Sequence, residues 1–132
     1  MKAFQSTIAS ILLLLNGLGA IYGGWKLITR PDGSSMRIWV SLLEQSPFQD
    51  FLIPGLGLLV FNGLPSLIAF VGMLANPRKF AWAVWVQGVI LCTWITIQVI
   101  MIEMLHPLHL VCVAAGLVLI LIGRNQSRPK FN

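Results

Sequence analysis

The chain has 132 residues, of which 57% are hydrophobic and only 10% are charged. Soluble domains carry about 25% charged residues, so this composition excludes a disordered chain, a basic nucleic-acid-binding domain and a disulfide-stapled secreted module. The formal net charge is +5, but in a membrane protein the placement of charges matters more than their sum. We therefore expect one integral membrane domain, residues 1–132, surrounded by the lipid bilayer.

The first apolar stretch runs from about Ala3 to Leu27. It follows Lys2 as in a signal peptide, but no convincing small-x-small cleavage site follows, so we expect a retained transmembrane helix. Small residues let helix backbones approach closely. They form a stripe at Ala9, Asn16, Gly19 or Ala20, and Gly23, with Gly19-x-x-x-Gly23 inside it.

The connection from Ile28 to Ser46 is long enough to hold structure of its own. It opens with the turn sequence Pro31-Asp32-Gly33-Ser34-Ser35. Apolar residues then follow at i, i+3, i+4 and i+7: Met36, Trp39, Val40 and Leu43. This spacing predicts a short amphipathic helix over residues 35–45 that lies at the membrane surface or over the mouth of the bundle.

A second apolar stretch runs from Pro47 or Phe51 to Ala75. Ser46 as a cap, Pro47 at the first helical position and Gln49 at the third predict a helix that begins at Pro47. Pro54 and Pro65 interrupt this span. Each removes a backbone hydrogen bond, so the helix is either kinked to fit its neighbours or broken at a transporter-like site.

The third and fourth apolar stretches run from Phe80 to about Leu105 and from Pro107 to Gly123, followed by a tail over residues 124–132. The short links between spans two, three and four predict antiparallel neighbours. Cys112-x-x-x-Gly116 and Gly123 repeat the small-residue pattern. Because the stretches do not alternate apolar and polar residues, a barrel is excluded. We expect an all-α fold, a four-helix transmembrane bundle.

The basic residues predict the orientation, because Lys and Arg accumulate on the cytoplasmic side. One side of the membrane would carry Lys2, Arg78, Lys79, Arg124, Arg128 and Lys130, with no acid. The other side would carry Lys26, Arg30, Arg37, Asp32, Glu44, Asp50 and Glu103. This split predicts that both termini are cytoplasmic.

Polar side chains occur within the apolar spans and should face the bundle interior. The candidates for an interior ligand site are Asn16, Asn62, Gln87, Trp94 and Gln98. On the third span, Gln87, Leu91, Trp94, Gln98 and Met101 share one face. Two interpretations are open: the amides only join helices, or they line a polar cavity for a small amphipathic ligand.

A second set of candidates lies at the outer rim: Trp39, Asp50, Glu103, His106 and His109. Glu-x-x-His occurs in di-metal bundles, but Pro107 separates the two histidines and further ligands are lacking, so we expect neither a metal site nor a cofactor. Cys92 and Cys112 are either small buried hydrophobes or a membrane-embedded redox pair, and no C-x-x-C spacing favours the latter.

Two runs carry a family resemblance: Gly24-x5-Arg30-Pro31-Asp32-Gly33-Ser34 and Ser46-Pro47-Phe48-x-Asp50-Phe51-Leu52-Ile53-Pro54-Gly55. Together with Trp94-Ile95-x-x-Gln98, they resemble a family of small bacterial four-span membrane proteins whose activity is unknown. The resemblance implies a location in the bacterial inner membrane. The size and layout also look like the DoxX-like superfamily, some members of which are linked to quinone oxidoreductase complexes, but no redox residues carry over.

These patterns predict a non-enzymatic membrane protein that binds a lipid-like ligand or a membrane-protein partner. One alternative is a subunit or small homo-oligomer that transports an ion or solute. Another is an accessory subunit in quinone-linked redox chemistry. No catalytic triad, P-loop or nucleotide fingerprint is present in the sequence.

Overall fold

A computed structural model describes residues 2–34, 50–102 and 107–127. The described residues form helices joined by turns, without a strand. In chain order the helical elements are α1 (Lys2–Thr29), α2 (Leu52–Gly57), η3 (Leu58–Gly63), α3 (Leu64–Ala75), α4 (Pro77–Ile102) and α5 (Pro107–Ser127). The predicted all-α four-helix bundle is confirmed.

Four described segments are long and apolar enough to cross a membrane: Ala3–Thr29, Leu52–Ala75, Pro77–Ile100 and His109–Gln126. The second combines α2, η3 and α3, which follow one another without interruption. Such lengths match the ~20 residues that the hydrocarbon core requires. The chain is therefore a multi-pass membrane protein.

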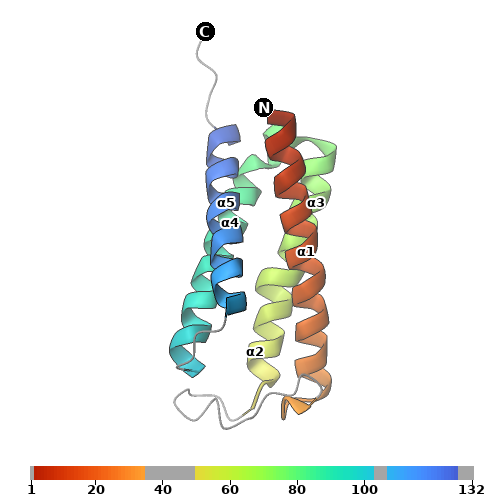
Figure 1. The fold of residues 1–132 in the computed structure, drawn as a ribbon. Coiled ribbons are helices and arrows are strands. Elements are labelled where there is room, and N and C mark those ends of the chain that lie inside the picture. Colours follow the sequence, from red (N-terminus) through yellow and green to blue (C-terminus); the bar gives the residue numbers. More distant parts are fainter. Residues whose placement is uncertain (1, 35–49, 103–106, 128–132) are drawn as a thin grey trace.

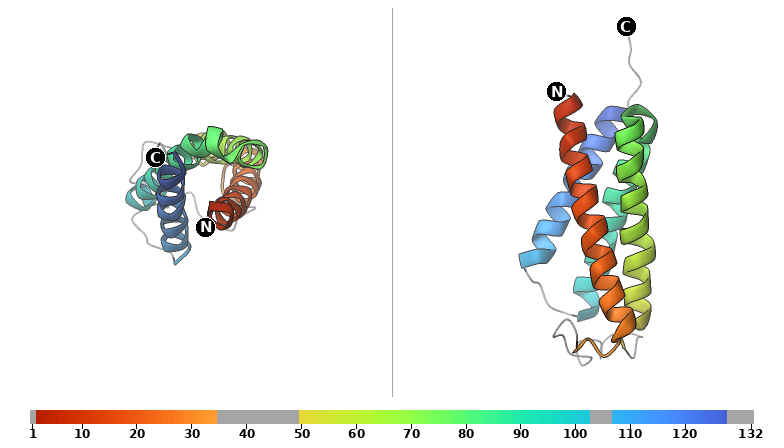
Figure 2. Two further views of the ribbon diagram at one scale, coloured as in Figure 1. Left: turned by 90° about the horizontal axis from the view of Figure 1, so that it is seen from above. Right: turned by 90° about the vertical axis from the view of Figure 1, so that its right-hand side faces the viewer.

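The helices run antiparallel, so the start of α1, the end of α5 and the turn between α3 and α4 lie at one end of the bundle (Figure 1). We call this the terminal end and the opposite one the connection end. α1 packs along α2, η3 and α3, and α4 packs along α5. These two hairpins stand beside each other, with α3 against α4 (Figure 2).

The apolar core lies toward the terminal end. Leu13, Val84 and Leu119 are 0% exposed, and they pack with Ala9, Ala69, Met73 and Ile122. These residues come from α1, α3, α4 and α5. Because all four long helices contribute, this cluster joins the two hairpins.

Polar side chains of α1 and α5 close the terminal end. Gln126 Nε2 donates to Ser6 Oγ at 3.0 Å, and Asn125 Nδ2 donates to Gln5 Oε1 at 2.9 Å. α5 therefore continues to Ser127, four residues beyond the predicted end at Gly123. The residues expected to begin the tail instead hold the first and last helices together.

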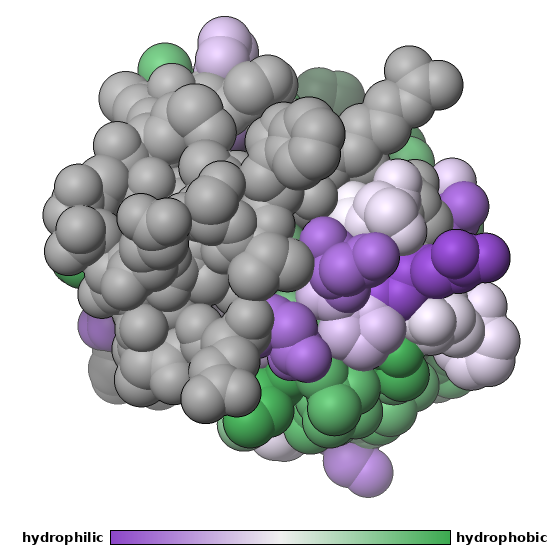
Figure 3. Space-filling view, turned by 90° about the horizontal axis from the view of Figure 1, so that it is seen from below, coloured by the Kyte–Doolittle hydropathy of each residue, from purple (hydrophilic) through white to green (hydrophobic). Residues whose placement is uncertain are grey.

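At the connection end, α1 ends in the predicted turn. The backbone N–H of Gly33 donates to the carbonyl of Arg30 at 3.0 Å, and Gly33 has a φ of 80°, a conformation that favours glycine. Seen from this end, hydrophilic side chains gather on part of the described face and apolar ones flank them (Figure 3). The predicted amphipathic helix at 35–45 lies outside the described residues.

The prediction that the second span begins at Pro47 as one helix is wrong. Residues 50 and 51 form bends, and α2 begins at Leu52. Asp50 Oδ1 accepts the backbone N–H of Leu52 at 3.0 Å, and the N–H of Phe51 donates to the carbonyl of Pro31 at 2.8 Å. These bonds fix the start of α2 against the turn after α1, so Pro54 falls within the first helical turn.

The third span, by contrast, begins earlier than predicted, at Pro77 instead of Phe80. Asn76 caps it, because its Oδ1 accepts the backbone N–H of Lys79 at 3.3 Å. Pro77 occupies the first helical position, where a missing N–H costs nothing. The link between α3 and α4 is thereby reduced to a single non-helical residue.

Candidate functional site

A layer of polar side chains crosses the middle of the bundle. It consists of Asn16 from α1, Asn62 from η3, Ser66 from α3 and Gln87 from α4. Asn62, Ser66 and Gln87 are buried. In hydrocarbon, each buried polar group needs a partner inside the protein, so their hydrogen bonds decide what this layer can do.

The amide nitrogen of Asn16 pairs with a hydroxyl across the first hairpin. Its Nδ2 donates to Ser66 Oγ at 2.8 Å. α1 and the second span approach closely here, because a Cβ on Gly17 would lie 3.3 Å from the carbonyl of Gly63 and 2.7 Å from a Leu67 methyl. The contact positions Asn16 as a link between helices.

The amide nitrogen of Gln87 pairs with the backbone of the other hairpin. Its Nε2 donates to the carbonyl of Phe61 at 3.2 Å. In a regular α-helix this carbonyl would accept the N–H of residue 65, but Pro65 has none. The Gln87 side chain supplies the donor that Pro65 removes.

The backbone around Phe61 is also irregular. Leu58–Gly63 form a π-helix, and the N–H of Leu64 donates to the carbonyl of Leu59, five residues back. π-helical turns are rare and frequent at functional sites. The second span is nevertheless helical from Leu52 to Ala75, with a change of helix type before Pro65, so neither proline interrupts it.

Asn62 lies within this π-helix and is 0% exposed. Neither its Nδ2 nor its Oδ1 has a hydrogen-bond partner among the described residues. An unpaired buried amide costs about 1–3 kcal/mol by mutational measures. Asn62 therefore offers one donor group and one acceptor group that the described fold leaves unused.

Trp94 and Gln98 do not join this layer. They lie seven and eleven residues after Gln87, which places them about 10 and 16 Å further along α4. Trp94 instead packs on α2, where a Cβ on Gly57 would lie 2.8 Å from Cη2 of the indole. The prediction of one cavity lined by all five candidates is corrected to a layer that holds three of them.

The outer-rim candidates are only partly described. Asp50 is exposed and accepts the N–H of Leu52, the first residue of α2, and His109 is buried in the first turn of α5. Trp39, Glu103 and His106 lie outside the described residues. Among residues that the structure describes, no three metal-ligating side chains lie together.

The small-residue stripes are right for one helix and partly wrong for the other. Gly116 and Gly123 both contact α4 closely. On α1, Ala9, Ala20 and Gly23 are buried, but Gly19 is exposed with nothing within 4 Å of an added Cβ. Gly17 and Gly24 make the close approaches instead.

Sequence reasoning missed Ser66 and the terminal contacts of Ser6 and Gln126. Ser66 lies four residues after Asn62, so the two share a helix face. That spacing was visible in the sequence and could have placed Ser66 in the polar layer. Ser6 and Gln126 are 120 positions apart, and their pairing requires the fold.

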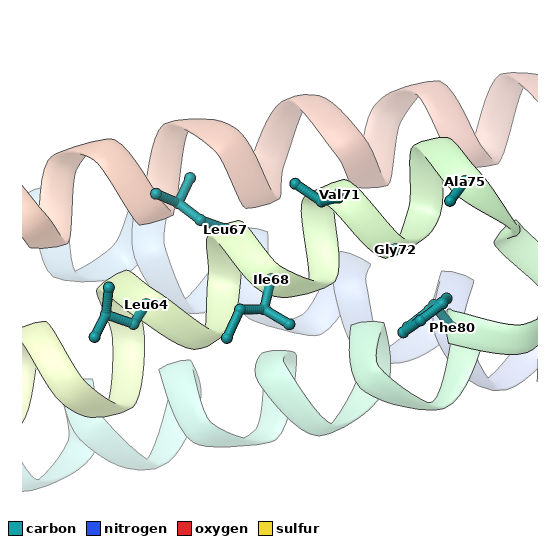
Figure 4. A pocket seen from close by; sticks show the side chains of 7 residues that line it. All are labelled: Leu64, Leu67, Ile68, Val71, Gly72, Ala75 and Phe80. Atoms are coloured by element: carbon teal, nitrogen blue, oxygen red, sulfur yellow. The ribbon is translucent and has the colours of Figure 1, made fainter.

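A separate apolar groove lies on the outside of the bundle, along α3 and the start of α4 (Figure 4). Its volume is about 450 Å³, and it is lined by Leu64, Leu67, Ile68, Val71, Gly72, Ala75 and Phe80. An added Cβ on Gly72 would lie 2.4 Å from the Phe80 ring. Glycine at this position therefore lets the ring lie directly against α3.

No family model, curated protein or solved structure matches this chain.

Proposed function

We propose that this chain is a non-enzymatic membrane protein that binds a lipid-like ligand, whose polar group pairs with the Asn62 amide in the central layer. The observation that carries the proposal is the fully buried Asn62 side chain without a hydrogen-bond partner among the described residues. A ligand with both a hydrogen-bond donor and an acceptor, such as an amide or a hydroxyl-bearing ester, would satisfy both ends of this side chain.

Burial favours a small ligand over a protein partner. Asn62 is 0% exposed, so a neighbouring transmembrane helix cannot reach it from the lipid face. Its neighbours Val60 and Phe61 are 49% and 55% exposed on that face. We propose that a small amphipathic molecule enters past them when the π-helical segment shifts.

The alternatives from the sequence receive less support. Transport requires a continuous polar path, whereas fully buried Leu13, Val84 and Leu119 lie between the polar layer and the terminal end. A quinone slot between Cys92 and Trp94 is not favoured, because the Cys92 thiol faces α5 and Trp94 faces α2.

Mass spectrometry of the intact protein from mild detergent tests the binding proposal. The wild type should retain a small molecule, and Asn62→Leu should lose it with unchanged or higher thermal stability, because an unpaired amide is removed. Ser66→Ala is the matched control and should retain it. An adduct that persists in Asn62→Leu, or a wild type without any adduct, would contradict the proposal.

We propose further that the protein lies in the bacterial inner membrane with both termini in the cytoplasm. The basic residues of the terminal end and the resemblance of the Ser46–Gly55 run support this orientation and location. In a background without the native cysteines, an impermeant thiol reagent added to whole cells should label Ser34→Cys and spare Ser127→Cys. The reverse labelling pattern would invert the topology.

A further inference from the structure

We propose a second ligand site for an anionic phospholipid. It lies along α3 and the start of α4, at the terminal end of the bundle. One acyl chain would occupy the apolar groove, and the phosphate would lie at Arg78 and Lys79. This site is distinct from the polar layer around Asn62 and does not depend on that proposal.

The groove has the chemistry of an acyl-chain site. Every side chain that lines it is apolar, and its volume is about 450 Å³. The lining residues of α3 extend from Leu64 to Ala75, which is about 16 Å along a helix. The hydrocarbon core is about 30 Å thick, so the groove spans the depth of one leaflet.

The end of the groove next to the α3–α4 turn lies at the depth of the lipid headgroups. Ala75 and Phe80 flank the turn between α3 and α4, and Figure 4 shows the Phe80 ring at that end of the groove. Leu64 is near the middle of the second span. A lipid with its tail in the groove would therefore carry its phosphate next to the turn.

Basic residues occupy that turn. Arg78 and Lys79 are exposed, and the Lys79 Nζ lies 5.8 Å from the centre of the Phe80 ring. The ammonium group thus stands beside the residue that ends the groove. The described residues of the terminal end carry no acidic side chain, so no neighbouring carboxylate among them neutralises these charges.

Charge distinguishes this occupant from the alternatives. A zwitterionic lipid would fill the groove but gain less from two cations at a membrane surface. A second copy of the chain, related by a twofold axis along the membrane normal, would bring two Arg78–Lys79 turns together in like-charge contact. An anionic phospholipid matches both the apolar groove and the basic turn.

The test is mass spectrometry of the intact protein in mild detergent, with equal amounts of phosphatidylglycerol and phosphatidylcholine of identical acyl chains. The wild type should retain phosphatidylglycerol preferentially. The double variant Arg78→Gln/Lys79→Gln should reduce that preference by roughly thirty-fold at low ionic strength. The control Lys2→Gln/Arg124→Gln removes the same net charge from the same end and should keep the preference.

A second pair of variants tests the groove. Val71 is 62% exposed and lines the groove, whereas Leu74 is 66% exposed on the same helix and does not. Val71→Trp should lower retention of both lipids, and Leu74→Trp should not. Both positions are exposed, so neither change disturbs the core.

Three outcomes would overturn the proposal. The first is a lipid preference that survives Arg78→Gln/Lys79→Gln. The second is lipid retention that survives Val71→Trp. The third is a dimer that Val71→Trp dissociates, because the groove would then be an interface between copies. Asn62→Leu should leave phosphatidylglycerol retention unchanged, which separates this site from the central one.

Discussion

The helices within each of the two hairpins are held together by different interactions. Between α4 and α5, glycines bring the backbones together: an added Cβ on Gly88 would lie 2.5 Å from the carbonyl of Gly116, and one on Gly123 would lie 2.4 Å from the N of Trp85. The first hairpin also has a close glycine pair, Gly24 and Gly55. It adds a π-helical segment and the buried polar groups of the central layer.

This difference distinguishes a hairpin held mainly by packing from one that also contains buried polar groups. In lipid, helices associate through close packing and interhelical hydrogen bonds, because hydrocarbon offers no hydrophobic driving force between them. The α4–α5 hairpin relies on packing and is regular throughout its described length. The irregular backbone and the unpaired amide both lie in the second span, so the ligand that we propose would gain most by binding there.

The largest expected effect is on the packed hairpin. Gly88→Ala places a methyl group against the Gly116 carbonyl, and backbone atoms cannot move aside as a flexible side chain would. We expect a loss of about 1–3 kcal/mol in unfolding free energy, measured by denaturant or thermal unfolding in detergent. Gly19→Ala is the control, because nothing lies within 4 Å of its added Cβ. Equal stability of the two variants would refute the packing argument.

The next effect tests the compensation between hairpins. Gln87→Leu removes the donor to the Phe61 carbonyl, and we expect a cost of about 0.6–1.7 kcal/mol. Pro65→Ala restores a backbone N–H that can reach that carbonyl. In a double-mutant cycle, Gln87→Leu should therefore cost less in the Pro65→Ala background.

Pro54→Ala provides the control background for this cycle. Pro54 lies in the first turn of α2, where its missing N–H leaves no interior carbonyl unpaired. Gln87→Leu should cost the same with or without Pro54→Ala. If both proline backgrounds reduce the cost equally, the link between Pro65 and Gln87 is not the cause.

A smaller effect is expected within the first hairpin. Asn16→Ala and Ser66→Ala each remove one end of the 2.8 Å hydrogen bond. Interhelical hydrogen bonds of this kind average about 0.6 kcal/mol in membrane proteins. The coupling energy from the Asn16/Ser66 double-mutant cycle should be near that value, and strictly additive losses would show that the bond contributes nothing.

The number and type of the spans could be predicted because length and apolar composition are direct consequences of the bilayer. The faces of the helices were harder to predict. A helix surrounded by lipid is apolar on its outer face as well as its inner one, so amphipathic periodicity is weak. Gly17 and Gly19 illustrate this limit: two residues apart, they point to opposite sides, and only the fold distinguishes the buried one from the exposed one.

Local backbone chemistry also has limits as a guide. The capping pattern at Ser46 and Pro47 predicted too early a start for the second span, because the contact of Phe51 with Pro31 is a tertiary one. The π-helix has no simple residue signature, although Pro65 signals that a carbonyl one turn earlier lacks its usual donor. The partner of that carbonyl, Gln87, lies on another helix and could be found only from the structure.

The smallest expected effect concerns the turn after α1. The backbone N–H of Ser34 donates to Asp32 Oδ1 at 2.9 Å. This bond, the Ser34 side chain and the charge of Arg30 lower the pKa of Asp32 from its ordinary value of 3.8. A carboxyl whose pKa is lower in the folded state stabilises the fold above the unfolded pKa, and this contribution is lost as pH falls through the folded pKa.

Asp32→Asn keeps an acceptor oxygen for Ser34 but removes the charge. Because Asp32 is fully exposed, water screens the interaction, and the variant should melt only slightly below the wild type at pH 7. That difference should shrink when the melting temperatures are compared at pH values below 3.8. A difference that grows on acidification would mean that the charge of Asp32 opposes the turn.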